Sequence, residues 1–236
     1  MSSSNSHVPA LPGGPVRTCW TYLRFSPCSL FELRKVPHLR ASMYEMADLT
    51  SWRVALAGRQ IYDRYGVTWA GKRLLDIGCG QILGYTLPLA MANTVTGIDT
   101  ELPLRRPILP AIWRTMRRSG LHRTIKSAVA AVLGQARLFE EGLRRATGFR
   151  GPFDYDLRCM DATKLEFPDA SFEGVCSFSV LEHLADPRSA LREMHRVLQP
   201  GGVCYLDLHL YTAIHGDHDP RGAAVPPWNH LRSPGR

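Results

Sequence analysis

Residues 73–84 read Arg-Leu-Leu-Asp-Ile-Gly-Cys-Gly-Gln-Ile-Leu-Gly, and this stretch decides the fold. Its first five residues form a mostly apolar run typical of a buried strand, with the carboxylate of Asp76 one residue from the end. The glycines that follow, Gly78, Gly80 and Gly84, predict a turn in which the backbone comes close to a ligand. Glycine suits such a turn because it has no side chain and tolerates positive φ.

The chain after this turn completes a β-α-β unit. Residues 85–92 predict a short helix and residues 94–99 a second strand, so the two strands lie parallel and are joined by a right-handed crossover. Asp99 closes the second strand 21 positions after Gly78. An acid at that place can accept hydrogen bonds from both hydroxyls of a ribose.

Further strands and helices alternate downstream. Strands are predicted over residues 155–160, 174–178 and 203–208, and a helix over residues 187–198 that Pro200-Gly-Gly202 ends. In that helix, core spacing is predicted for Leu191, Met194, His195 and Leu198. Together with the first unit, this gives five parallel strands with helices between them. The expected fold is a doubly wound, Rossmann-like α/β domain.

Two other segments flank this alternation. Residues 18–70 begin with aromatic and basic residues and end in a predicted helix over 46–65, so they are expected to form a helical N-terminal cap. Residues 1–17, which precede the cap in the chain, are expected to be a disordered tail. Residues 102–150 hold eleven basic and two acidic residues, a net charge of +9, so the remainder of the chain, whose total is +8, carries −1 and the basicity belongs to this basic insert. Apolar stripes predict that the insert is helical, with one stripe running unbroken from Ile125 to Leu143.

Composition excludes several classes of protein. No run of apolar residues is long enough for a membrane-spanning helix, and the first residues lack the apolar core of a secretory signal. The six cysteines include no CxxC pair, which excludes a disulfide scaffold or zinc ribbon. We therefore expect a cytoplasmic protein with reduced thiols.

Four motifs, taken together and in order, resemble the class I S-adenosylmethionine (SAM) dependent methyltransferases of the small-molecule, type 11-like kind. They are LLDIGCGQILG (74–84), GID (97–99), CMDATKLEFPDASFEGVCSFSVLEHLADP (159–187) and LREMHRVLQPGG (191–202). The resemblance implies SAM as the cofactor. It also disfavours a nicotinamide oxidoreductase, whose glycine fingerprint, GxGxxG, differs from GxGxxxG by one residue.

The resemblance also implies roles for particular residues. Asp76, Gly78 and Gly80 would line the methionine part of SAM, and Asp99 would hold the ribose hydroxyls. Four more cofactor-binding residues follow later in the chain: Asp161 and Ala162 at the adenine, and Phe178 and Ser179 at the methionine end. Because the sulfonium already makes the methyl group electrophilic, the protein mainly has to align a nucleophile with it.

Two polar clusters each have two interpretations. His183, beside Glu182, is a candidate general base, and the alternative is that both residues stabilise the turn after the fourth strand or the start of a helix. A second cluster of polar residues follows the last predicted strand: His209, His215, Asp217, His218 and Asp219. It is interpreted as a polar loop near the substrate opening rather than a metal site.

The basic insert, 102–150, also has two readings. It is either a lid that recognises an acidic or lipid-like acceptor or an anionic membrane surface, or a solvated helical face over the sheet edge. Nucleic acid is disfavoured, because no Asn-Pro-Pro-Tyr or Asp-Pro-Pro-Tyr run follows the fourth strand. The sequence leaves the oligomeric state open.

One departure from the family concerns the end of the chain. The family's sheet has seven strands, whereas the residues after Leu208 form an irregular segment, 210–236, that predicts no further strands. We therefore expect the sheet that residues 71–236 would form to lack the family's last strands. A catalytically inactive, methyltransferase-like binding protein thus stays an alternative to an enzyme that methylates a small-molecule or lipid-like acceptor.

Overall fold

The computed structural model describes residues 38–103, 113, 116–117, 124 and 127–208. The predicted tail (1–17) and C-terminal segment (210–236) lie outside the described residues, as does the histidine-rich cluster at 209–219. None of the helices in the described ranges is both long and apolar enough to cross a membrane.

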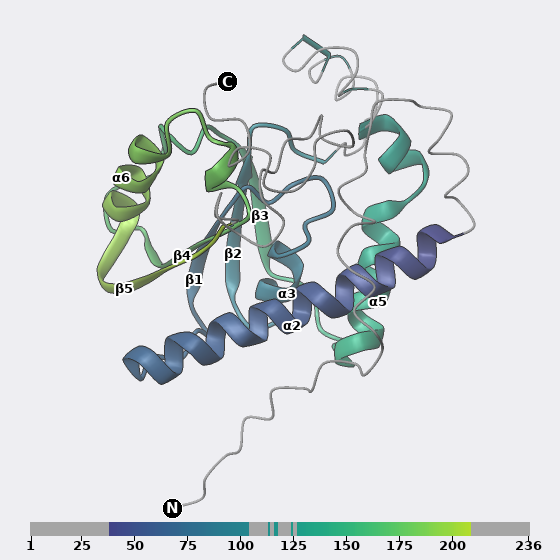
Figure 1. Cartoon of the computed structure of the whole chain (residues 1–236), viewed down its shortest axis with the longest axis horizontal. Coiled ribbons are helices and arrows are strands. Elements are labelled where there is room, and N and C mark those ends of the chain that lie inside the picture. The colour runs from purple at the N-terminus through teal and green to yellow at the C-terminus, as the bar shows by residue number, and fades with distance from the viewer. Residues whose placement is uncertain (1–37, 104–112, 114–115, 118–123, 125–126, 209–236) are drawn as a thin grey trace, which may run out of the picture.

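A parallel sheet of five strands forms the centre of the described structure (Figure 1). Its order is β3-β2-β1-β4-β5, and all four pairings are parallel. The strands are β1 (Arg73–Ile77), β2 (Thr94–Asp99), β3 (Tyr155–Cys159), β4 (Phe172–Phe178) and β5 (Leu198–Asp207). This confirms the predicted doubly wound α/β fold.

Helices cover both faces of the sheet (Figure 1). Helix α6 (Pro187–Val197) packs on one face, where Ala190, Met194 and Val197 meet Leu75 and Val175. On the other face lie α2 (Leu39–Tyr65), α3 (Thr86–Ala90) and α5 (Gln135–Thr147). Side chains alternate along β1, so neighbouring residues of this strand serve opposite faces of the sheet.

Helices α2 and α5 pack tightly against each other. Gly142 of α5 makes this possible, since a Cβ built there would lie 2.9 Å from Tyr44 Cδ1 and 3.0 Å from Tyr44 Cα. The buried core beside this contact includes Met43 and Phe139. The end of α5 is fixed by Gly148, whose left-handed conformation closes the helix.

Three predicted details of the helices are wrong. Helix α2 begins at Leu39 rather than Met46, because its buried stripe extends back to Met43. The stripe expected from Ile125 to Leu143 is interrupted at Gly134, which has a φ of +65° directly before α5. His195 is exposed rather than in the core, since α6 turns its Ala190–Met194–Val197 face to the sheet.

Strand β5 also differs from its prediction. It begins at Leu198, directly after α6, so Pro200-Gly201-Gly202 lies within the strand instead of ending the helix. The pairing of β4 with β5 shifts register between Phe172 and Gly174. This irregularity accommodates the extra residues around Gly201, whose φ is +77°.

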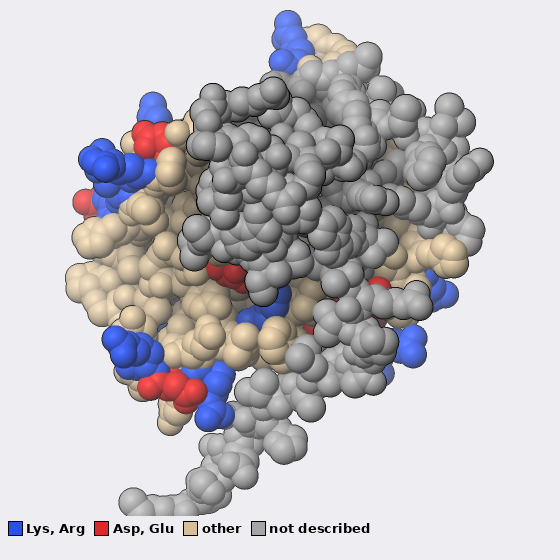
Figure 2. All heavy atoms as spheres, viewed as in Figure 1, with Lys and Arg blue, Asp and Glu red and all other residues tan. Residues whose placement is uncertain are grey.

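Charged side chains lie at the rim and near the centre of the face that Figure 2 shows. In the described part of this face, Lys and Arg occur at several separate places, and Asp or Glu lies beside some of them. The Lys and Arg side chains of the described residues therefore form no single continuous patch on this face.

Candidate functional site

The carboxyl ends of the parallel strands form one edge of the sheet, where ligands bind in folds of this kind. The predicted cofactor residues follow this edge in strand order. Asp161 comes after β3, Asp99 ends β2, the glycine turn follows β1, and Phe178 ends β4. The structure thus places these predicted residues along a single edge.

The glycine turn wraps closely over the end of β2. Gly78 and Cys79 donate backbone hydrogen bonds of 2.8 and 3.0 Å to the carbonyl of Ile98. Both Gly78 (φ +81°) and Gly80 (φ +66°) are in the left-handed region, which favours glycine. This conformation brings the turn directly beside Asp99.

The two glycines differ in what surrounds them. A Cβ on Gly78 would lie 2.3 Å from Val180 Cγ2, so the side chain of Val180 already fills the space at Gly78. A Cβ on Gly80 would meet no atom of the described residues within 4 Å. The open space of the turn is therefore at Gly80.

Asp99 joins the turn to the end of β2. Its Oδ2 accepts a 3.0 Å hydrogen bond from the Gly80 amide, and its Oδ1 accepts a 2.9 Å bond from the Glu101 amide. Each carboxylate oxygen can accept more than one hydrogen bond, so capacity remains for two further donors. The geometry suits a pair of hydroxyl groups arriving from the edge.

Asp76 lies underneath the turn and is buried. Its Oδ2 accepts a 2.6 Å hydrogen bond from the hydroxyl of Thr86 at the start of α3. Burial raises the pKa of Asp76 to about 6; the Thr86 hydrogen bond partly opposes this rise, and the nearby charge of Asp99 adds to it. The sequence did not point to Thr86, because a hydroxyl group ten residues after an acid is not a recognisable motif.

Asp161 and Ala162 form the turn after β3. Oδ1 of Asp161 accepts hydrogen bonds of 2.8 Å from both the amide and the hydroxyl of Thr163, and these bonds lower the pKa of Asp161. The Asp161 side chain is exposed while Ala162 is buried. The carboxylate is thus fixed in orientation and open to a ligand.

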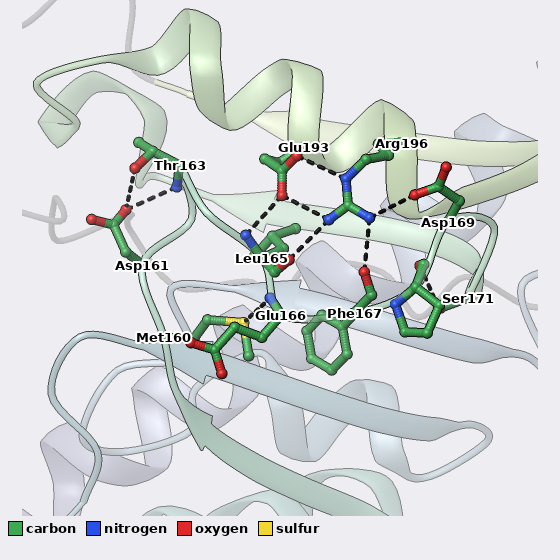
Figure 3. Close-up of polar contacts among 11 residues, drawn as sticks. Met160, Asp161, Thr163, Leu165, Glu166, Phe167, Asp169, Ser171, Glu193 and Arg196 are labelled. Atoms are coloured by element: carbon green, nitrogen blue, oxygen red, sulfur yellow. Dashed lines mark hydrogen bonds and ion pairs between the residues drawn. The ribbon is translucent and has the colours of Figure 1, made fainter.

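The loop that carries Asp161 is tied to α6 by one arginine (Figure 3). Arg196 donates to the carbonyls of Leu165 and Phe167 at 2.9 and 2.8 Å, and to the carboxylates of Glu193 and Asp169. Glu193 in turn accepts a 2.8 Å hydrogen bond from the Leu165 amide. These bonds hold the loop that follows Asp161 against the body of the domain.

Phe178 and Ser179 lie at the end of β4. Phe178 is buried and stacks on Tyr85, with ring centroids 4.1 Å apart and planes at 6°. Ser179 has a φ of +55°, an unusual value for a residue other than glycine, and its amide donates a 2.6 Å hydrogen bond to the carbonyl of Asp207. The strained residue is where β4 and β5 meet at the edge.

Glu182 and His183 belong to a short 3-10 helix, Leu181–His183, just after this point. Glu182 is half-buried, His183 is exposed, and the His183 amide donates a 2.9 Å hydrogen bond to the carbonyl of Val180. The role of either side chain as a base stays a prediction.

An ion pair at the edge was missed by sequence reasoning. Arg53 of α2 donates to Oδ2 of Asp207 at 2.5 Å and to the hydroxyl of Tyr85 at 2.5 Å. Asp207 is the last residue of β5, and both side chains of the pair are 24% exposed. The partners are 154 residues apart, so no local sequence pattern could have indicated the pair.

Comparisons with known proteins place this arrangement in context. A family model described as a methyltransferase domain matches residues 127–206. A ubiquinone biosynthesis O-methyltransferase of Pseudomonas aeruginosa is 34% identical over 141 residues, which cover 58% of this chain and 44% of that protein. A protein of Mycolicibacterium smegmatis described as an S-adenosylmethionine-dependent methyltransferase is 29% identical over 143 residues, covering 61% of this chain and 40% of its own.

Among solved structures, the (4+2) cyclase SpnF is similar with a TM-score of 0.41 and 24% identity, over 70% of this chain and 50% of that one. The match to each of the two curated relatives spans less than half of the relative's length.

Proposed function

The chain belongs to the class I SAM-dependent methyltransferases, and from this membership we propose that it binds SAM along the carboxyl edge of the sheet and transfers the methyl group to a small-molecule acceptor. The observation that carries the proposal is the hydrogen bond that the Gly80 amide donates to the Asp99 carboxylate. It puts the open part of the glycine turn and the acid at the end of β2 within reach of one ligand.

The residues present fit an adenosyl ligand in two ways. The space over Gly80 admits a ligand against the backbone, and Asp99 keeps hydrogen-bonding capacity for ribose hydroxyls. Asp161, exposed and fixed by Thr163, would accept from the adenine amino group one strand further along. When bound, SAM supplies an electrophilic methyl group, and the chain's own residues have to orient it and the acceptor.

We further propose that the acceptor atom is an oxygen. The name of the Pseudomonas aeruginosa relative, an O-methyltransferase, supports this choice. A cytoplasmic location remains part of the proposal, and it is compatible with the described cysteines, all of which are free thiols: Cys79, Cys159, Cys176 and Cys204.

For the basic insert we propose contact with an acidic or lipid-like acceptor or an anionic lipid surface. In support, Trp113 is 55% exposed and Val132 84%, and the guanidinium of Arg117 lies 4.1 Å from the centre of the Trp113 ring. Exposed aromatic and basic side chains of this kind suit a membrane interface. Sedimentation with phosphatidylglycerol and with phosphatidylcholine vesicles tests the lipid surface: binding to the former alone, lost in Trp113→Ala/Arg117→Ala, is expected, and equal behaviour with both would favour a merely solvated face.

Calorimetric titration with S-adenosylhomocysteine tests the cofactor proposal without knowledge of the acceptor. We expect binding that Asp99→Ala weakens by about tenfold or more, because hydrogen bonds to a charged group contribute about 1.5–3 kcal/mol. Asp156→Ala is the matched control, since Asp156 is an exposed carboxylate on β3 paired with Arg158, and it should change nothing. Absent binding by a folded chain would favour a non-catalytic domain, and binding of NADH instead would favour an oxidoreductase.

A further inference from the structure

We propose that Asp207, held in place by Arg53, lies beside the methyl group that is transferred and takes up the proton that the acceptor loses. This inference rests on the proposed function, because it assigns a role within the same site. Its starting point is the ion pair between the last residue of β5 and the middle of α2.

The order of the strands puts Asp207 at the end of the predicted ligand path. Along the edge stand Asp161 after β3, Asp99 at the end of β2, the glycine turn after β1, and then β4 and β5. A ligand with adenine at Asp161 and ribose at Asp99 extends its methionine part past the turn toward β4. Since adjacent strands lie about 4.8 Å apart, the end of β5 is about 10 Å beyond β1, on the side where an acceptor would approach.

Contacts with β4 fix the position of Asp207 further. Asp207 is the register partner of Phe178, and its carbonyl accepts the 2.6 Å hydrogen bond from the Ser179 amide. Phe178 and Ser179 are the residues predicted to close over the methionine end of the cofactor. The Asp207 carboxylate therefore belongs to the part of the edge where the methyl group would lie.

Arg53 holds this carboxylate in one orientation. Its guanidinium binds Asp207 through one terminal nitrogen and the Tyr85 hydroxyl through the other, so two elements of the edge fix a planar group. Both side chains of the pair are about three-quarters buried. Because the desolvation of a buried ion pair often offsets its attraction, a gain in stability alone does not explain the pair. Arg53 donates to Oδ2, and among the described residues no hydrogen-bond donor contacts Oδ1, so Oδ1 keeps its capacity to accept a proton.

The step balances without another reactant. A lone pair on the acceptor's oxygen or nitrogen forms the bond to the methyl carbon, and the methyl–sulfur bond breaks with its electron pair going to sulfur. The proton of the acceptor passes to Oδ1 of Asp207. Arg53 touches neither the acceptor nor the methyl group, so it is a positioning residue.

Sinefungin tests this placement without an identified acceptor, because it is a SAM analogue with an amine in the place of the methylated sulfonium. A carboxylate beside the methyl position binds that ammonium but gains nothing from S-adenosylhomocysteine. We expect Asp207→Asn to weaken sinefungin about tenfold or more, and S-adenosylhomocysteine less than threefold. Equal losses for the two ligands, or no loss for sinefungin, would overturn the inference.

Asp63→Asn is the matched control, since Asp63 is a carboxylate of α2 paired with Arg59 and about half exposed. It should leave both affinities unchanged. Because Asp207→Asn disturbs an ion pair that also packs α2, a crystal structure of the unmodified chain with sinefungin gives an independent measurement. A distance of about 3.5 Å or less between the amine and the Asp207 carboxylate is expected, and one beyond about 5 Å contradicts the proposal.

The two proposals fail in different ways. If the folded chain binds neither sinefungin nor S-adenosylhomocysteine, the cofactor site itself is wrong, and this inference is overturned with it. If both bind and the amine lies away from Asp207, the proposed function stands and only the role of Asp207 is lost.

Discussion

Thr86 donates a 2.6 Å hydrogen bond to Asp76 in a place where the carboxylate is only 1% exposed. A buried acid whose pKa differs between the folded and unfolded states makes stability depend on pH. The pKa of Asp76 is raised by burial from 3.8 to about 6, so the folded state binds its proton more tightly than the unfolded state does.

The sign of the dependence follows directly. The contribution of Asp76 to the free energy of unfolding is fully present below pH 3.8. It is lost as the pH rises through about 6, which lowers the free energy of unfolding by about 3 kcal/mol. Asp76→Asn should abolish this component. Urea denaturation of both proteins from pH 4 to 8 measures it as the difference between the two curves, and parallel curves would show that Asp76 titrates normally.

Gly80→Ala is expected to separate ligand binding from folding. The φ of +66° strains any L-residue by about 1–2 kcal/mol, but no neighbouring atom obstructs the new methyl group. Gly66→Ala, at φ +68° in the C-cap of α2, carries the same penalty away from the edge. Both variants should lose similar stability, whereas only Gly80→Ala should lose at least tenfold in calorimetric affinity for S-adenosylhomocysteine. Similar affinities would place the cofactor elsewhere.

Arg196→Met should loosen the loop that carries Asp161. The substitution removes donors to two carbonyls and two carboxylates, leaving Glu193 partly buried without its cation, so a loss of about 2–4 kcal/mol is expected. Hydrogen exchange at the amides of residues 165–167 should become faster. Arg192→Met, a substitution at an exposed position of the same helix, is the control. Equal stability and equal exchange rates in the two variants would show that the hydrogen bonds of Arg196 do not hold the loop.

Gly142→Ala tests the contact of α2 with α5. The new methyl group would lie 2.9–3.0 Å from Tyr44, including its backbone, so the helices have to separate at a cost of about 1–3 kcal/mol. Gly58→Ala in α2 meets no atom within 4 Å and should instead stabilise by about 0.5–1 kcal/mol. Thermal denaturation distinguishes the two, and a neutral Gly142→Ala would mean that the helices are not closely packed in solution.

Local patterns were sufficient to predict β1, β2 and the glycine turn between them. β1 and β2 have the predicted limits, because an apolar strand and a glycine turn are specified by adjacent residues. The helix faces were harder to predict. In α6 the side that meets the sheet is Ala190–Met194–Val197, one step around the helix from the predicted face, so Leu191 and His195 point outward.

The limits of α2 and the ion pair at the edge depend on distant parts of the chain. Ala47 and Ala57 are fully buried because other elements pack closely on them, and small residues give a weak hydrophobic signal. Arg53 and Asp207 meet only after the sheet has formed. The residues around Arg53 or around Asp207 alone could therefore not have predicted this ion pair.

The same ion pair has a consequence for how the chain acquires its structure during synthesis. Helix α2 is synthesised before all of its partners, which are residues 69–95, then α5 and, 154 residues after Arg53, the end of β5. The part of its apolar side that meets residues 69–95 can therefore pack early, whereas the part that meets α5 and the end of β5 has to wait for those elements, and such long-range contacts form slowly. Formation of the Arg53–Asp207 ion pair is consequently expected among the last events of folding, after the strand that ends at Asp207 has joined the sheet.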